Sequence, residues 1–326
     1  MMGKDKNRYG QYFTIEAIAD FMVSLIRHDR SASVLEPSCG RGVFLDQLEK
    51  YGFNNISAYE IDPALNPPYP YVQYRSFVSS PLDERFDVIV GNPPYIRWKN
   101  IEPELKSELE DSSLWKRYFN SLCDYLFIFI LKSIEQLTEN GELIFICPEY
   151  WMNTTHSRSL RDYMIANGSL SEIFHFKDAA LFEGVTSSYV VFRYVKSVHN
   201  AGIDLYRYNQ KGKPSVQELQ QKSCFDFIRI PQFRQGERWV LASEEDRMLL
   251  SAFEQECSKR SDDLFSPVDM YRLGDFCDIG NGMVSGLDKA FRIKDVSGLN
   301  DGEKSHLIHV YKAKDCLLYT SPSPRD

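Results

Sequence analysis

The sequence predicts an α/β fold in which a mostly parallel sheet of seven strands carries helices on both faces. Strand-like and helix-like segments alternate through roughly the first 195 residues. The segment 86–90 is β-branched and apolar, as expected of a central strand buried on both faces. The 326 residues are 43% hydrophobic and 26% charged, which suffices for a sizeable core and about two domains.

Local patterns place the individual elements. A first amphipathic helix follows from apolar residues spaced i, i+3, i+4 and i+7, with Thr14 expected at its N-cap: Ile15, Ile18, Ala19, Met22, Leu25 and Ile26. Further helices are expected at residues 43–50, 124–137 and 243–259. Strands are expected at residues 33–35, 56–59, 72–77, 86–90, 143–147, 173–176 and 188–195. Residues 200–222 are polar and resemble a peripheral hairpin or loop, and residues 306–311 resemble a further strand.

Composition excludes several classes of protein. No apolar run approaches the roughly 20 residues that a membrane helix needs, and the polar start is not typical of a secretory signal. The seven cysteines lack disulfide or zinc-ligand spacing, so we expect a reducing, cytoplasmic location and no metal. The net charge of −8 is not typical of a polyanion binder. We therefore expect weak duplex binding by this chain alone.

Two turns at strand ends carry the first candidate site residues. Residues 36–42 (Glu-Pro-Ser-Cys-Gly-Arg-Gly) join a strand to a helix, where glycines let a ligand approach the backbone closely. Leu45 stands where the dinucleotide fingerprint requires its third glycine, which disfavours a nicotinamide dehydrogenase. The initial acid, Glu36, suits a ligand with a positive charge. Glu60 ends the next strand, where a carboxylate accepts from ribose hydroxyls. Each feature alone is equally compatible with an ordinary turn or a solvated carboxylate.

A third turn is more specific. Residues 92–95 (Asn-Pro-Pro-Tyr) directly follow the buried strand 86–90. The prolines stiffen the turn, so that the Asn92 side-chain oxygen and the Pro93 carbonyl can both accept from one planar NH2 group. Tyr95 offers a flat face for a base. Residues 66–69 repeat the tetrapeptide in a proline-rich loop without a preceding apolar strand, and we interpret that copy as a loop without chemistry.

With these motifs in order, the chain resembles the γ-class of N6-adenine DNA methyltransferases of bacterial restriction–modification systems. Residues 10–14 (Gly-Gln-Tyr-Phe-Thr) resemble the family's N-terminal motif, 36–42 its S-adenosylmethionine (SAM) loop, Glu60 its ribose-binding acid and 92–95 its catalytic motif. The resemblance covers about residues 10–291 and implies a Rossmann-like SAM-dependent methyltransferase fold. The implied catalytic residues are Asn92, Pro93, Pro94 and Tyr95. The implied cofactor residues are Tyr12, Thr14, Glu36, Pro37, Ser38, Gly40, Gly42, Glu60, Ile61, Ser76, Phe77, Asn92 and Phe129.

Three of the implied positions are open to another interpretation. Phe129 would line the SAM adenine pocket, and Phe182 would pack with Tyr95 against a flipped target base; plain core packing explains either phenylalanine equally well. Ser76 stands where the family usually has an Asp that accepts from the SAM adenine. Serine still forms hydrogen bonds but is neutral and shorter, so this adenine contact is in question.

The resemblance implies transfer of a methyl group from SAM to the N6 amine of a flipped adenine in double-stranded DNA, without a metal. Alternatives are an RNA adenine-N6 methyltransferase, a protein glutamine-N5 methyltransferase, or a non-catalytic DNA-recognition module. Arg97 and Lys99 follow the implied catalytic turn, where a phosphate could lie, although a solvated surface is at least as good an interpretation of each. A cognate restriction endonuclease in a separate chain is a further expected partner.

The same resemblance divides the chain. We expect a catalytic domain at residues 1–242, a connecting helix at 243–267 and the beginning of a target-recognition domain at 268–315, with a boundary near Val268. Residues 316–326 lack any helix or strand period and resemble one reading frame of a sequencing adapter. We therefore expect an artefactual tail and a recognition domain that is cut short.

Overall fold

The computed structural model describes residues 12–177, 179, 181–182, 187–210, 212–258 and 296–305. Contacts divide the chain into two compact units, Met1–Gln255 and Glu256–Asp326. The division falls within the segment 243–267 that was expected to connect two domains. The expected boundary near Val268, the strand at 306–311 and the tail at 316–326 lie outside the described residues. In the second unit, a short helix, α10 (Asp301–Lys304), is described.

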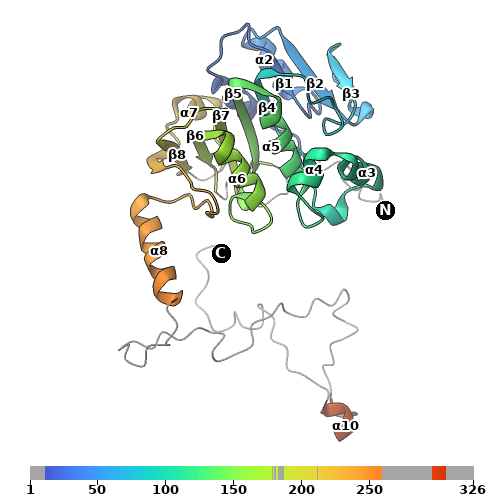
Figure 1. Ribbon diagram of the computed structural model, residues 1–326, viewed down its shortest axis with the longest axis vertical. Coiled ribbons are helices and arrows are strands. Elements are labelled where there is room, and N and C mark those ends of the chain that lie inside the picture. Colours follow the sequence, from blue (N-terminus) through green and yellow to red (C-terminus); the bar gives the residue numbers. More distant parts are fainter. Residues whose placement is uncertain are drawn as a thin grey trace. The chain divides into compact units, whose positions relative to one another are not determined.

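The first unit is built on a mixed sheet (Figure 1). Its described strands are β1 (Val34–Glu36), β2 (Ile56–Glu60), β3 (Val72–Tyr74), β4 (Phe86–Gly91), β5 (Leu137–Pro148), β6 (Gly168–His175), β7 (Tyr189–Lys196), β8 (Gly202–Tyr208) and β9 (Phe225–Pro231). They form a 9-stranded sheet in the order β3-β2-β1-β4-β5-β7-β6-β8-β9. The strands from β3 to β5 in that order are parallel, whereas β7 runs antiparallel to both β5 and β6.

The prediction of seven strands was wrong in number, and the sheet is mixed, with five parallel and three antiparallel pairings, whereas the α/β class is confirmed. Residues 200–222, expected to be a peripheral hairpin or loop, contain β8 and the helix α7 (Val216–Gln221). The strand β8 pairs in parallel with β6 and antiparallel with β9. Its charged residues obscured the strand pattern, because Asp204 lies opposite Arg229 and forms an ion pair with it across the strands.

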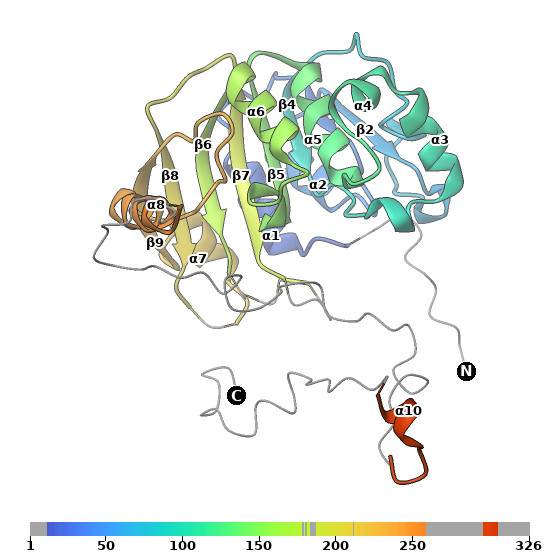
Figure 2. The same cartoon turned by 60° about the horizontal axis from the view of Figure 1, so that its bottom comes forward.

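Helices cover both faces of the sheet (Figure 2). On one face lie α1 (Glu16–Ser24), α2 (Val43–Lys50) and α7, and on the other lie α3 (Pro103–Asp111), α4 (Ser113–Tyr118), α5 (Tyr125–Gln136) and α6 (Arg158–Asn167). Successive strand residues alternate between the two cores: Val88 and Val90 pack with α1 and α2, while Ile89 packs with α5. This burial on both faces explains why the central strands are continuously apolar.

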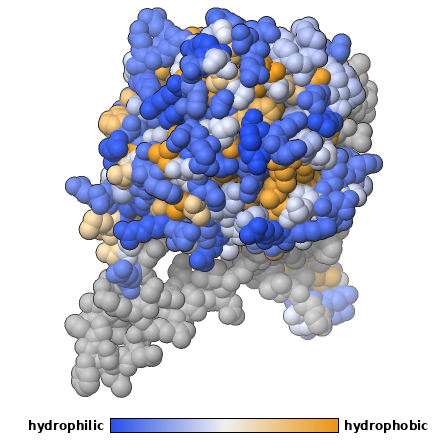
Figure 3. Space-filling view, turned by 45° about the horizontal axis from the view of Figure 1, so that its top comes forward, coloured by the Kyte–Doolittle hydropathy of each residue, from blue (hydrophilic) through white to orange (hydrophobic). Residues whose placement is uncertain are grey.

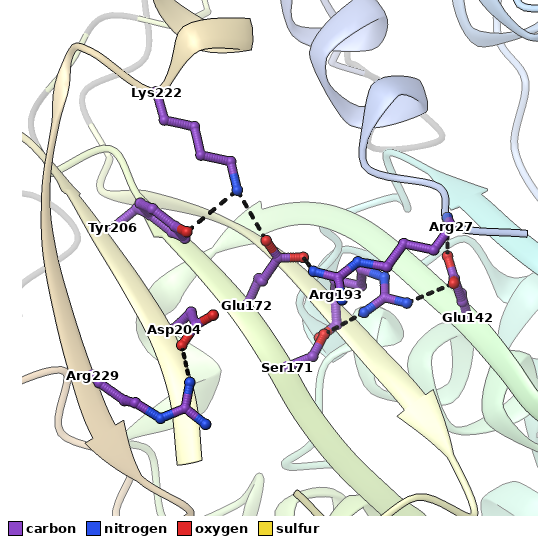
Figure 4. A network of polar contacts seen from close by, with 9 residues as sticks. All are labelled: Arg27, Glu142, Ser171, Glu172, Arg193, Asp204, Tyr206, Lys222 and Arg229. Atoms are coloured by element: carbon purple, nitrogen blue, oxygen red, sulfur yellow. Dashed lines mark hydrogen bonds and ion pairs between the residues drawn. The ribbon is translucent and has the colours of Figure 1, made fainter.

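A network of ion pairs, built on the buried carboxylates of Glu142 and Glu172, joins the antiparallel half of the sheet (Figure 4). Glu142 on β5 and Arg193 on β7 form an ion pair at 2.5 Å with 4% and 6% of their side chains exposed. Glu142 also accepts from the Arg27 main chain at 3.1 Å. On the next strand, Glu172 pairs with both Arg27 and Lys222 at 3.0 Å. Charged residues can therefore occupy inner strand positions here because each carboxylate has a cationic partner.

The face shown in Figure 3 is mainly hydrophilic, with hydrophobic residues in patches between the hydrophilic ones. The helix α8 (Glu244–Ser258) exposes Met248, Leu249 and Phe253. Among the described helices, none is long and apolar enough to cross a bilayer. Within the same residues, no cluster of three or more His, Cys, Asp or Glu side chains is arranged to hold a metal ion.

Candidate functional site

The candidate site lies at the carboxyl ends of β1, β2 and β4, where the strand order reverses. From β1 the chain proceeds outward through β2 to β3 and then returns to the other side of β1 with β4. Open parallel sheets bind ligands in the crevice that such a reversal leaves. The turn 37–42 follows β1, Glu60 ends β2 and Asn92 follows β4. The fold thus brings three motifs that are distant in sequence to one edge.

Glu60 is held rigidly by the backbone of two loops. Its carboxylate accepts from the Gly40 main-chain N–H at 2.7 Å and from the Asp62 N–H at 2.8 Å. Gly40 adopts a φ of 55°, a conformation that glycine adopts readily. Burial raises the pKa of Glu60, while the two N–H donors act in the opposite direction. The contact therefore couples the loop after β1 to the end of β2.

Glu36, at the end of β1, is a buried carboxyl group with a free oxygen. It is 1% exposed, and its Oε2 atom has no hydrogen-bond partner among the described residues. Burial, followed by the charges of Glu60 and Asp46, raises the pKa of Glu36 well above its usual value. A buried carboxylate without a partner is costly, and a bound cation would offset that cost. Glu36 thus favours a positively charged ligand group.

Two adjoining cavities surround these residues. The first is open to solvent, has an empty volume of about 600 Å³ that includes part of that solvent, and is lined by Tyr12, Phe13, Pro37, Ser38, Gly40, Glu60, Ile61, Arg75, Ser76, Phe77, Asn92, Pro94, Leu105, Tyr125 and Phe129. The second is likewise open, has an empty volume of about 680 Å³ counted in the same way, and is lined by Tyr12, Phe13, Thr14, Glu36, Ser38, Cys39, Gly40, Arg41, Val43, Phe44, Asp46 and Asn92. Asn92 lies at the boundary that they share.

The sequence-based cofactor positions fall into these two linings, with one exception. Gly42 lines neither cavity, because its φ of 90° turns the chain and its Cα faces Tyr69. A Cβ atom there would lie 2.8 Å from the Tyr69 ring. Tyr69 belongs to the second Asn-Pro-Pro-Tyr segment, which is a loop as expected and packs against the helix start. Gly42 therefore has a packing role toward Tyr69 rather than a lining role.

Several lining residues were missed by the sequence reasoning. Arg75, Leu105 and Tyr125 line the first cavity, and Arg41 and Asp46 line the second. Their patterns were typical of a strand end, amphipathic helices or a solvated turn, so no local signal distinguished them. Phe129 both lines the first cavity and packs on Phe77, with ring centroids 5.1 Å apart. Phe129 is therefore both a pocket-lining residue and a core residue.

The Asn92 side chain is oriented by three hydrogen bonds. Its Nδ2 atom donates to the Tyr12 carbonyl at 2.8 Å and to Thr14 Oγ1 at 3.0 Å. Its Oδ1 atom accepts from the Tyr95 hydroxyl, which also lies 2.7 Å from the Ile146 carbonyl. The expected N-cap role of Thr14 was wrong: Ile15 is the N-cap of α1, without a side-chain cap, and the Thr14 hydroxyl contacts Asn92 instead.

Aromatic rings gather beyond Asn92. Tyr95 and Phe182 lie outside both cavity linings, and the ring of Tyr12 contacts each of them. Phe182 also packs on Tyr189, with centroids 4.7 Å apart. Burial raises the pKa of Tyr95 well above its usual value, so its hydroxyl remains a proton donor. These aromatic rings therefore pack against one another next to the polar side chain of Asn92.

The two basic residues that follow the turn 92–95, Arg97 and Lys99, are exposed. Arg97 and Lys99 lie at the short helix η2 (Trp98–Asn100), and Arg97 bridges to Asp124 through the main chain. Their exposure is compatible with either a phosphate contact or a solvated surface, so that role stays a prediction.

The fold is similar to the folds of solved restriction–modification proteins and of a protein solved as a candidate SAM-dependent methyltransferase. A chain solved in a study of complex assembly and conformational transition in a type I restriction–modification system superimposes with a TM-score of 0.56 at 12% identity, covering 77% of this chain and 64% of that one. The type IIG restriction endonuclease BpuSI superimposes with a TM-score of 0.51 at 16% identity, covering 66% and 30%. A Listeria monocytogenes protein solved as a candidate class I SAM-dependent methyltransferase has a TM-score of 0.50 at 17% identity, covering 67% and 73%.

The amino-acid sequence is similar to one protein family and to individual methyltransferases. Residues 46–182 match the model of the Eco57I restriction-modification methylase family. The chain is 42% identical over 309 residues to the Type II methyltransferase M.HindII of Haemophilus influenzae, covering 94% of this chain and 59% of that relative. It is 39% identical over 305 residues to M.HincII of the same species, covering 94% and 58%. The chain is thus a relative of the Type II methyltransferases and spans less than two thirds of their length.

Proposed function

We propose that the chain is the catalytic part of a site-specific DNA methyltransferase that transfers a methyl group from SAM to the N6 amine of an adenine extruded from double-stranded DNA. The observation that carries the proposal is the position of Asn92. Its amide lies in a proline-stiffened turn at the end of a buried strand and lines both cavities. The relatives named above are Type II methyltransferases, which supports DNA as the substrate.

The residues of the two cavities fit SAM. Glu60 would accept from the ribose hydroxyls, with Ile61, Ser76, Phe77 and Phe129 around the adenine. Glu36 lines the second cavity, where its unpaired Oε2 atom would accept from the SAM ammonium group. The bound cofactor supplies an activated methyl group on its sulfonium. The protein therefore needs to hold the acceptor in line rather than to provide a nucleophile.

For the acceptor, the Asn92 Oδ1 atom and the Pro93 carbonyl would both accept from the exocyclic amine. Two such hydrogen bonds reduce the delocalisation of the nitrogen lone pair into the ring and expose it for attack. The S–CH3 bond breaks as the N–CH3 bond forms, and the amine proton leaves for solvent. Catalysis of this kind consists of positioning and electrostatic stabilisation.

An adenine inside a duplex cannot reach Asn92, so the proposal includes base flipping at a cost of about a few kcal/mol. Stacking between Tyr95 and Phe182 would offset part of that cost. Because the Tyr12 ring now contacts both, it must move before a base can stack there. Arg97 and Lys99 would contact a neighbouring phosphate.

The decisive experiment incubates the chain with SAM carrying a labelled methyl group and unmethylated genomic DNA at low salt. The DNA is then digested to nucleosides, and N6-methyladenine is quantified. Asn92→Ala should keep its SAM affinity within about threefold while losing methylation by a factor of about 100 or more. Asn66→Ala, in the second Asn-Pro-Pro-Tyr segment, is the matched control and should stay active. Undiminished methylation by Asn92→Ala, or no SAM binding by the wild type, contradicts the proposal.

The same assay discriminates the alternatives. Methylated RNA, or methylated glutamine in a peptide, with unmodified DNA would favour an RNA or protein methyltransferase. A recognition module would bind no SAM at all. Within the proposal, the enzyme works in the cytoplasm beside a cognate restriction endonuclease in a separate chain, which purification from the source organism would test.

A further inference from the structure

We infer that Thr14 is a positioning residue that fixes the amide of Asn92 in the orientation needed for methyl transfer. This inference rests on the proposed function and assigns Thr14 a role other than the cofactor contact that the family resemblance implies. The contact joins the segment before α1 to the turn after β4. It therefore links two parts of the site that neither the strand pattern nor the motif spacing relates.

The orientation of the amide follows from its partners. A main-chain carbonyl can only accept a hydrogen bond, so the amide atom 2.8 Å from the Tyr12 oxygen must be Nδ2. The second hydrogen on Nδ2 is donated to Thr14 Oγ1 at 3.0 Å. Both donors are thus used, and Oδ1 must point the other way. The reversed orientation would place Oδ1 against the Tyr12 carbonyl, with two acceptors facing each other.

Thr14 is well placed to hold this orientation. It is 9% exposed, and its hydroxyl does not cap α1, since Ile15 occupies the N-cap position. The segment is anchored by α1 itself, where the N–H groups of Ile18 and Ala19 donate to the Ile15 carbonyl. The Asn side-chain amide rotates about a broad torsional minimum when it has no partners. Because α1 anchors the segment that carries Thr14, the hydrogen bond from Asn92 Nδ2 to Thr14 restricts rotation of the Asn92 amide.

This orientation leaves Oδ1 available to the substrate. The Tyr95 hydroxyl carries one proton and has two acceptors, Asn92 Oδ1 and the Ile146 carbonyl at 2.7 Å. When the adenine amine donates to Oδ1, the Tyr95 proton can turn to Ile146 without any rotation of the amide. The acceptor for the reaction is thus exposed by moving one hydrogen rather than a side chain.

The test compares Thr14→Val, which keeps the shape but removes the acceptor, with Thr14→Ser, which keeps the hydroxyl. Thr14→Val should lower kcat by roughly 10- to 100-fold while KM for DNA and the Kd for SAM change by less than about threefold. Thr14→Ser should restore kcat to within about threefold of the wild type. Thr14→Ala is a second variant without the acceptor, in case valine prevents folding, and thermal melting monitors the fold of each.

The outcomes separate this inference from the proposed function. An unchanged kcat in Thr14→Val, with Asn92→Ala inactive, overturns the positioning role and leaves the proposed function intact. A Kd for SAM weakened as much as kcat makes Thr14 a cofactor contact and also overturns the inference. Full activity of Asn92→Ala contradicts the proposed function itself.

Discussion

The phenol ring of Tyr12 stacks on the ring of Tyr95, with centroids 5.6 Å apart and planes inclined by 25°. The edge of the same Tyr12 ring meets Phe182, at a centroid distance of 6.3 Å and an angle of 68°. Tyr12 therefore contacts both rings to which the proposed function assigns base stacking. Its main-chain carbonyl accepts a hydrogen bond from the Asn92 side chain. A substitution of the Tyr12 ring can therefore remove the aromatic contacts while it keeps the main-chain hydrogen bond.

Removing the Tyr12 ring should help a base to occupy the site. Tyr12→Ala keeps the carbonyl that orients Asn92 but removes an aromatic contact worth about 0.5–1.5 kcal/mol, which a base must otherwise displace. We expect KM for genomic DNA to fall by a factor of about 2–10, with kcat little changed. Steady-state methylation assays measure both values. Tyr12→Phe keeps the ring and should behave as the wild type, whereas a raised KM in Tyr12→Ala would mean that the ring supports DNA binding.

Glu36→Gln should stabilise the protein without ligand and weaken its affinity for SAM. The raised pKa of Glu36 means that, above its usual value of 4.5, the folded chain binds more protons at this site than the unfolded chain. The free energy of unfolding therefore falls as pH rises from 4.5 to the raised folded pKa. Glutamine does not titrate, so the free energy of unfolding of the variant does not fall in this way. The melting temperature of the variant should therefore exceed that of the wild type at pH 8 and be close to it at pH 5.

The same substitution removes the charge that would pair with the SAM ammonium group. We expect the Kd for SAM to rise by roughly 10-fold or more, because a hydrogen bond to a charged group contributes about 1.5–3 kcal/mol. Calorimetric titration gives the affinity and scanning calorimetry the melting temperature. Glu110→Gln, at an exposed position of α3, is the control and should change neither. A variant that binds SAM as tightly as the wild type would exclude Glu36 from the ammonium site.

Lys132→Met should loosen the loop that lines the first cavity. Lys132 is 1% exposed, and its ammonium group donates to the carbonyls of Phe77, Val78 and Ser80 at 2.7, 2.9 and 2.5 Å. Methionine leaves these carbonyls without that donor, so we expect a loss of about 1–3 kcal/mol in the free energy of unfolding. Because Ser76 and Phe77 line the cavity, the affinity for SAM should fall as well.

The pH dependence of that loss has a definite sign. Burial lowers the pKa of Lys132 from 10.5 to about 8, so between these values the unfolded chain binds more protons than the folded one. The contribution of Lys132 to the free energy of unfolding therefore rises with pH across this window. The difference between the wild type and Lys132→Met in urea melts should be larger at pH 9.5 than at pH 7.5. A difference that shrinks over this range would contradict the assignment.

Gly42→Ala should destabilise the chain more than Gly52→Ala does. Both glycines have positive φ values, 90° and 87°, so alanine is strained at either position. At Gly52 a Cβ meets nothing within 4 Å, whereas at Gly42 it lies 2.8 Å from the Tyr69 ring. We expect the Gly42 substitution to cost about 1–3 kcal/mol in urea melts and to exceed the Gly52 value. Adding Tyr69→Ala should recover the excess, and equal costs at the two glycines would disprove the packing role.

Local sequence patterns predicted several helices and strands of this protein. The helix expected at residues 43–50 is α2 with the same bounds, and the strand at 86–90 is β4 extended by Gly91. Continuous apolar runs identify such strands because they are buried on both faces. The Asn-Pro-Pro-Tyr turn after β4 was identified for the same reason: its context is local, since the buried strand directly precedes it.

Tertiary structure alone decided the rest. The strands β8 and β9 were hidden because their charged residues are satisfied by partners on neighbouring strands, as Asp204 is by Arg229. The partner of Thr14 is Asn92, far away in the sequence, and the residue against Gly42 is Tyr69 from a loop without a periodic pattern. A sequence pattern reports which face of an element is apolar. Which polar atom meets which depends on how the strand order reverses at β1 and β4, and that geometry exists only in the folded chain.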